Sequence, residues 1–421
     1  MFDLVCFFPQ LYLTNNGPEN LAINTFIRLA CFLRVFIVRQ TMRILPTLTI
    51  LTCMQFLGAN TAQSVAFDVK PFTINLSSLR MESLVENTHL PTQPEYPGLG
   101  ATLGIDLDIL KGLQNTWTSS YSWTNAQAQF NKLNHFTVTI EGLTIHFIHQ
   151  KSGQNNSIPL ILNHGWPGTF QDFVPLISGL TSVSQTPNGK NVSFNVVIPS
   201  LPDTARVFNQ LMTQVLGYET YSAFGTDWGC LIAYSLYSTY PTSLRALALD
   251  YLPFFPLSRD QLAADDITLD AFRNFAYEIY EHALATGTGY FVEQNTEPNT
   301  IGIALYDNPV VPFSQSSDTM LNLYEGSDPR AGTNGSLINP ETTLNTVSLY
   351  YLTQSFVSSV FTYAQNPNGF QTTYSKANTD APLLFSAFQY NNQYWPPEVV
   401  AMVGNLVSYT VTLVLLGIPK I

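Results

Sequence analysis

The stretch Tyr221-Ser-Ala-Phe-Gly-Thr-Asp-Trp-Gly-Cys230 decides the fold of this chain. Its centre, Gly225-Thr-Asp227-Trp-Gly229, has the small-x-nucleophile-x-small pattern of a nucleophile elbow, a sharp turn from a strand into a helix. Such a turn crowds the backbone two residues either side of the nucleophile, so glycine fits where a Cβ would clash. We therefore expect Asp227 at the edge of a sheet, in a strained backbone conformation.

The sequence on either side of this turn supports the elbow. Residues 218–224 form a β-rich run, and residues 230–237 have the pattern of a buried helix that ends before Pro241. An Asp between two glycines is, by itself, more typical of an ordinary turn. The flanking strand and helix favour the elbow, and a second motif upstream, described below, favours it further.

The composition bounds the function of the 421-residue chain. With 45% hydrophobic residues the chain can fill a large core, and only 11% of its residues are charged. The net charge of −12 comes without basic clusters, which argues against nucleic acid and anionic membranes as partners. No CxxC, HExxH or paired-histidine spacing occurs, so we expect neither a metal site nor a cofactor.

Residues 1–62 read as a leader. Residues 42–62 have the short basic start, apolar middle and small-residue exit of a secretory signal peptide, which makes Met42 the expected true start and the preceding residues an overlong gene model. The alternative is membrane anchoring by an apolar segment at 22–38. Four sequons support passage through a secretory pathway, and we expect a secreted protein; their asparagines are Asn75, Asn155, Asn191 and Asn334.

The cysteines do not predict a disulfide framework. Cys6, Cys31 and Cys53 lie in the leader, so a processed chain keeps only Cys230. Because Cys230 falls just inside the elbow helix, we interpret it as a small buried apolar residue and not as a nucleophile.

The body of the chain predicts a mainly parallel sheet flanked by helices. Residues 63–157 form an N-terminal arm with helices near 77–86, opened by a serine cap, and near 106–114, followed by a hairpin that turns at Glu141-Gly142. His146 and His149 then belong to sheet faces. Short apolar strands alternate with helices over 158–254, the first part of the core, and again over 375–421, the second part. Residues 255–374 interrupt the alternation with helices at 268–287 and 340–365 and are a lid candidate.

Two motifs in order carry a family resemblance. His164-Gly-Trp-Pro-Gly168 follows the strand at 158–163, and Gly225-Thr-Asp-Trp-Gly229 follows a later one. Together they resemble the epoxide hydrolases of the α/β-hydrolase fold, and the arm, with Tyr121-Ser-Trp123, is most similar to the microsomal-type branch. The resemblance covers most of residues 68–409 and implies the α/β-hydrolase fold with a helical lid.

The resemblance also implies a mechanism and a small apolar epoxide as substrate. Asp227 would attack an epoxide carbon and form an alkyl ester, and the backbone N–H groups of Trp166 and Trp228 would hold the oxyanion when water attacks that ester. Tyr290 and Tyr363 would hold and protonate the epoxide oxygen. The resemblance leaves open whether the chain forms a homodimer.

The sequence departs from the family where the second half-reaction needs a general base. None of its six histidines follows His282, although the family has one after the last core strand, here at 404–409. Asn391 stands where the mammalian microsomal enzymes have a glutamate, and Glu398 is a less favoured alternative for that acid. The Gly-rich aromatic loop that the family has after residues 198–202 is missing as well.

These departures predict a split between the two half-reactions. A carboxylate is ionised at neutral pH and attacks without a base, so ester formation at Asp227 should survive while ester hydrolysis is largely lost. Gene-model errors and a real pseudoenzyme would both produce this sequence. The alternatives are therefore a catalytically dead secreted binding protein or a gene-model fragment, and, among enzymes, a haloalkane dehalogenase. The elbow holds Asp227 and not Ser, which argues against a serine esterase.

Overall fold

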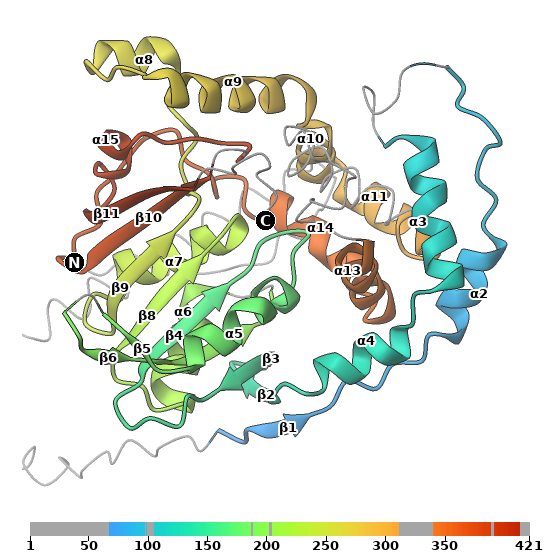
Figure 1. Cartoon of the computed structure of the whole chain (residues 1–421), viewed down its shortest axis with the longest axis horizontal. Helices are drawn as coiled ribbons and strands as arrows, with labels where there is room; N and C mark the ends of the chain where they lie inside the picture. Colours follow the sequence, from blue (N-terminus) through green and yellow to red (C-terminus); the bar gives the residue numbers. More distant parts are fainter. Residues whose placement is uncertain are drawn as a thin grey trace, which may run out of the picture. The chain divides into compact units, whose positions relative to one another are not determined.

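A computed structural model describes residues 67–96, 98, 105–186, 188–201, 204–310, 340–388 and 391–412, which fold as part of one unit from Phe67 onward (Figure 1). The leader, the sequon at Asn334 and residues 413–421 lie outside the described residues, so the signal peptide and the secreted location stay predictions. None of the helices in the described ranges is both long and apolar enough to span a lipid bilayer.

The main sheet has nine strands in the described part of the chain, in the order β1-β2-β3-β7-β4-β8-β9-β10-β11. Their bounds are β1 (Lys70–Phe72), β2 (His135–Ile140), β3 (Leu143–Gln150), β4 (Ile158–Asn163), β7 (Phe194–Pro199), β8 (Tyr221–Gly225), β9 (Leu244–Leu249), β10 (Pro382–Phe388) and β11 (Asn405–Thr412). The strands from β7 to β11 in this order pair in parallel, whereas β1, β2 and β3 add an antiparallel edge. A short ribbon pairs β5 (Ser184–Gln185) with β6 (Asn191–Val192).

The parallel strands are apolar because helices cover both faces of the sheet. Along β4, Ile161 packs into one core with helix α7 (Trp228–Thr239), and its neighbours Leu160 and Leu162 pack into a second core on the opposite face. Strand side chains alternate between faces, so a strand buried on both sides needs a continuous apolar run. The predicted fold class, a mainly parallel sheet flanked by helices, is confirmed.

The predicted hairpin also forms. Strands β2 and β3 pair antiparallel with Ile140 opposite Leu143, and the two turn residues Glu141 and Gly142 have φ of 52° and 84°. Two successive positive φ values are typical of the tight turn whose twist matches that of the flanking strands.

Helices fill the arm, the layers beside the sheet and the lid candidate at 255–374. Their bounds are α2 (Leu79–Asn87), α3 (Leu107–Ser119), α4 (Trp123–Phe130), a 3₁₀ turn (Phe170–Phe173), α5 (Val174–Thr181), α6 (Ala205–Gln210) running into a π-helical turn (Leu211–Val215), α7 (Trp228–Thr239), α8 (Arg259–Ala264), α9 (Ala271–Thr286), α10 (Gly289–Thr296), α11 (Pro298–Ala304), α13 (Pro340–Leu352), α14 (Phe356–Gln365) and α15 (Pro397–Val400). In Figure 1 the lid helices α10, α11, α13 and α14 lie beyond the ends of the parallel strands, next to the arm.

Two local predictions were wrong. The single helix expected at 340–365 is two helices, α13 and α14, because the chain breaks at Gln354, whose φ is 55°. The serine cap expected at the first arm helix is not made, since Ser78 itself has helical backbone angles and its side chain makes no capping bond. Asp106 does cap α3, accepting hydrogen bonds from the N–H groups of Asp108 and Ile109 at 2.8 and 3.2 Å.

Candidate active site

Asp227 lies at the sharp corner between β8 and α7. Its backbone has φ 48° and ψ −127°, a strained conformation for a residue with a side chain. A Cβ added at Gly225 would overlap the carbonyl of Gly229, and one added at Gly229 would overlap the carbonyl of Asn163 on β4. The two glycines therefore permit the tight turn that holds the carboxyl group of Asp227 at the end of the strand.

Two backbone N–H groups point at this carboxyl group. The N–H of Trp166 donates to Oδ1 of Asp227 at 2.8 Å, and the N–H of Trp228 donates to the same side chain. Trp166 follows β4, the strand next to β8, and its indole N–H donates to Oγ of Ser359 in α14 at 3.1 Å. Donors fixed in this way can stabilise negative charge that develops on an oxygen atom attached to the carboxyl carbon of Asp227.

Burial raises the pKa of Asp227 to about 6, and the hydrogen bonds from Trp228 and Trp166 lower it only in part. The carboxyl group is therefore mostly ionised at pH 7, but it is poorly solvated. An anion with few hydrogen-bond partners is a competent nucleophile without help from a base.

Asp227 opens into a cavity of about 320 Å³ that it shares with two lid tyrosines, Tyr290 of α10 and Tyr363 of α14. The ring of Tyr290 stacks on Trp166 with 5.7 Å between ring centroids, and the ring of Tyr363 stands perpendicular to that of Tyr290 at 5.9 Å. The rings of Tyr363 and Trp228 also meet in a T-shaped arrangement, with 4.8 Å between ring centroids. The structure thus brings together all five residues that the resemblance placed at the centre of the chemistry.

Both phenol groups stay protonated over the ordinary pH range. Burial, and next the negative charge of Asp227, raises the pKa of Tyr290 above its usual value. Burial also raises the pKa of Tyr363, with contributions from Tyr290 and Asp227. A protonated phenol facing a carboxylate across a small cavity can donate to an oxygen atom of a bound molecule.

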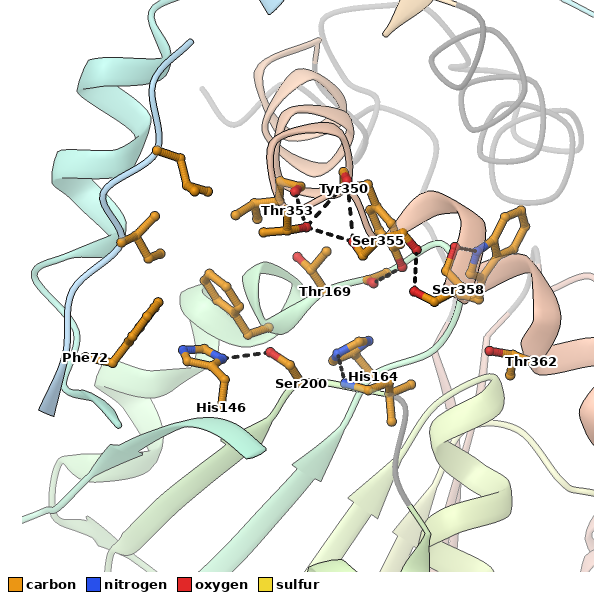
Figure 2. A pocket seen from close by; sticks show the side chains of 18 of the residues that line it. Phe72, His146, His164, Thr169, Ser200, Tyr350, Thr353, Ser355, Ser358 and Thr362 are labelled. Atoms are coloured by element: carbon orange, nitrogen blue, oxygen red, sulfur yellow. Dashed lines mark hydrogen bonds between the residues drawn. The ribbon is translucent and has the colours of Figure 1, made fainter. Parts of the chain in front are cut away.

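A second, larger cavity of about 470 Å³ adjoins the same tryptophans, Trp166 and Trp228 (Figure 2). Figure 2 shows His146 and Ser200 joined at its wall, where Nδ1 of His146 lies 2.8 Å from Oγ of Ser200. The other ring nitrogen of His146 lies 2.9 Å from Nδ1 of His135. Burial lowers the pKa of His146 to about 3, so His146 stays neutral. It is therefore too weak a base to activate Ser200.

Among the described residues, no histidine lines the cavity of Asp227. His146 and His149 lie on sheet strands as predicted, and burial lowers the pKa of His149 to about 4. His164 is also buried with a pKa lowered to about 4, and its Nδ1 donates to the carbonyl of Gly165 at 2.9 Å. His282 is exposed on α9. No described imidazole is placed to act on an ester at Asp227.

The two residues considered for the acid position lie outside this cavity. Nδ2 of Asn391 donates to the backbone carbonyl of Asp250 at 3.1 Å. Glu398 pairs on the surface with Arg273, at 3.1 Å between Nη1 and Oε1, so the alternative role for Glu398 was wrong. Cys230 is fully buried in α7, as expected of a small apolar residue.

Sequence reasoning missed two carboxyl groups near Asp227 whose pKa values are raised. Asp250 follows β9, and Asp172, the third residue of the 3₁₀ turn after β4, accepts from the N–H of the capping residue Thr169 at 3.1 Å. Burial, with a further contribution from the charge of Asp227, raises the pKa of each to about 7. The available signal for Asp250 was an acidic residue that ends an apolar strand. Within the described ranges, no three His, Cys, Asp or Glu side chains gather as ligands for a metal ion.

Comparisons with known proteins point to one family. The sequence profile "Epoxide hydrolase N terminus" matches residues 69–173. A protein of Stigmatella aurantiaca assigned to the epoxide hydrolases is 31% identical over 302 residues, which are 68% of this chain and 66%, slightly less than two thirds, of that protein.

Solved structures agree with the sequence comparisons. The epoxide hydrolase of Aspergillus niger superposes with a TM-score of 0.68 at 26% identity, covering 83% of this chain and 91% of that one. The juvenile hormone epoxide hydrolase of the silkworm Bombyx mori superposes with a TM-score of 0.67 at 25% identity, covering 82% and 87%.

Proposed function

The chain belongs to the epoxide hydrolase family of the α/β-hydrolase fold, and on that premise we propose that it opens small apolar epoxides by forming an alkyl ester on Asp227. The observation that carries this proposal is one carboxylate that accepts hydrogen bonds from two N–H groups and shares a cavity of about 320 Å³ with two phenols. The aromatic walls of that cavity favour an apolar substrate.

In the first step, the carboxylate of Asp227 attacks an epoxide carbon, and the bond between that carbon and the epoxide oxygen breaks. The departing oxygen gains negative charge and takes a proton from Tyr290 or Tyr363, which face Asp227 in the same cavity. A phenol suits this task because its pKa, raised here by burial, keeps the proton in place until an alkoxide forms.

In the second step, water attacks the ester carbonyl, and the N–H groups of Trp166 and Trp228 receive the oxyanion. Because no described histidine lines the cavity, we propose that this step is much slower than the first in the 421-residue chain. The alkyl-enzyme should therefore accumulate, with little release of diol.

Incubation of the purified chain with styrene oxide, followed by intact-protein mass spectrometry, tests the proposal. The expected result is a single added styrene oxide mass that maps to the peptide containing Asp227 and is absent from Asp227→Asn. Steady diol production would refute the slow second step. Saturable binding of styrene oxide without any adduct would support a binding protein, and chloride release from a haloalkane without epoxide opening would support a dehalogenase.

A further inference from the structure

Asp250 is placed beside Asp227 by the pairing of β8 and β9. Gly225 pairs with Leu249 at the carboxyl ends of these parallel strands, so Asp227 comes two residues and Asp250 one residue after the paired positions. The carboxyl ends of parallel strands meet at one edge of the sheet, which is where ligands bind in open α/β folds. The next residue, Tyr251, lines the cavity that contains Asp227.

The surroundings of Asp250 hold its carboxyl group in place but leave it incompletely bonded. The side chain of Thr226, the residue before the nucleophile, donates a hydrogen bond to it, and Nδ2 of Asn391 fixes its backbone carbonyl at 3.1 Å. Its Oδ1 is buried and has no hydrogen-bond partner among the described residues. A buried, unpartnered carboxylate oxygen is costly to maintain and is therefore a candidate for a functional role.

We propose that Asp250 is the general base for hydrolysis of the alkyl ester on Asp227. This inference rests on the proposed function, because it needs the ester to form. It supplies the role for which no described histidine is available, and it accounts for whatever ester hydrolysis the chain performs.

The surroundings of Asp250 give its carboxyl group a pKa suited to proton transfer near neutral pH. Burial is the largest cause of its raised pKa, about 7, and the charge of Asp227 raises it further, while the bond from Thr226 lowers it. The other titratable group beside it is the buried thiol of Cys230, whose pKa both carboxylates raise. No described cation contributes to the shift of Asp250. Asp250 thus keeps its proton to a higher pH than Asp227 does, and esterification of Asp227 removes one of the causes that raise the pKa of Asp250.

The protons balance over a full cycle. When the epoxide opens, a tyrosine gives its proton to the new alkoxide, and the proton of Asp250 restores the tyrosine, which leaves Asp250 as a carboxylate. Asp250 then takes a proton from water as the water oxygen bonds to the ester carbonyl carbon. The tetrahedral oxyanion collapses, the bond between that carbon and the alkoxy oxygen breaks, and the proton of the regenerated acid passes to the diol. Asp227 is again ionised and Asp250 again protonated.

The test follows formation and decay of the styrene oxide adduct in single turnover by quenched-flow and intact mass, from pH 5 to pH 9. For the wild type, the decay rate should rise with pH to a plateau, with its midpoint at or below pH 7. Asp250→Asn should still form the adduct, lose about 10²-fold in decay rate on the plateau, and show decay that does not depend on pH.

Two further variants keep the test decisive if Asp250→Asn does not fold. Thr226→Val removes the donor that lowers the pKa of Asp250, so the midpoint of the decay profile should move to higher pH. Asp172→Asn is the matched control, because Asp172 also carries a carboxyl group whose pKa is raised to about 7 but follows a different strand; its decay profile should match that of the wild type.

A wild-type decay rate that is constant between pH 5 and pH 9 would overturn the role of Asp250. Decay in Asp250→Asn at the wild-type rate, or an unchanged midpoint in Thr226→Val, would do the same. These outcomes leave the ester on Asp227 intact as a finding. The absence of any adduct on Asp227 would instead overturn both this inference and the proposed function.

Discussion

Replacing Asp227 by Asn should stabilise the folded protein at neutral and alkaline pH. The pKa of Asp227 is about 6 in the folded protein against a model value of 3.8. Because this pKa is raised, the contribution of the group to stability is fully present below the unfolded value and is lost as pH rises through about 6. A shift of roughly two units corresponds to about 3 kcal/mol between pH 4 and pH 8.

The substitution of Asp227 by Asn isolates the free-energy cost of ionising the carboxyl group, because Asn keeps most other interactions of Asp227. Its side-chain oxygen can still accept from the N–H of Trp166, and Asn is among the residues that best tolerate a positive φ. The free energy of unfolding of Asp227→Asn should therefore exceed that of the wild type by about 2–3 kcal/mol at pH 8, and the gap should close toward pH 4.

Urea denaturation followed by tryptophan fluorescence at pH 4.5, 6 and 8 measures this difference. Asp106→Asn is the control, since Asn caps a helix as well as Asp does at the start of α3. A wild type as stable as Asp227→Asn at pH 8, or a gap that does not change with pH, would refute the account of a poorly solvated carboxylate.

Three further predictions concern the elbow and the lid. Gly229→Ala should destabilise the fold by about 3 kcal/mol or more, because its Cβ overlaps the backbone of Asn163; a thermal midpoint equal to that of the wild type would contradict this. Tyr290→Phe and Tyr363→Phe should each slow adduct formation by about tenfold, and the double variant by about 10²- to 10⁴-fold, as measured by stopped-flow quenching; an unchanged double variant would show that neither phenol protonates the epoxide oxygen. The rate of adduct formation should fall as pH is lowered through about 6, where Asp227 takes up a proton. A rate that stays the same down to pH 4.5 would contradict the raised pKa of Asp227.

The sequence predicts the parts of this structure that depend on local chemistry. The spacing of Gly225 and Gly229 around Asp227 predicts the elbow, because the turn has no room for side chains at those positions. Glu141-Gly142 predicts the hairpin for a similar reason, since the turn needs two positive φ values. Apolar runs between helices predict the parallel sheet.

The parts that depend on tertiary neighbours could not be predicted in this way. Helical periodicity runs through residues 340–365, so nothing local predicts the break at Gln354 between α13 and α14. Glu398 could not be assigned to a surface pair with Arg273 without knowing that α9 and α15 approach each other. Asp250 stands far from Asp227 in the chain, and only the register of β8 and β9 shows that the two carboxyl groups are neighbours.

The most direct test of the central claim is a single-turnover reaction with excess enzyme and styrene oxide in H₂¹⁸O. If Asp227 is the nucleophile, water attacks the ester carbonyl, so the ¹⁸O should appear in the peptide that contains Asp227 and the first-turnover diol should carry none. Appearance of ¹⁸O in the diol, with an unlabelled Asp227 peptide, would show that water opens the epoxide directly and would contradict the account.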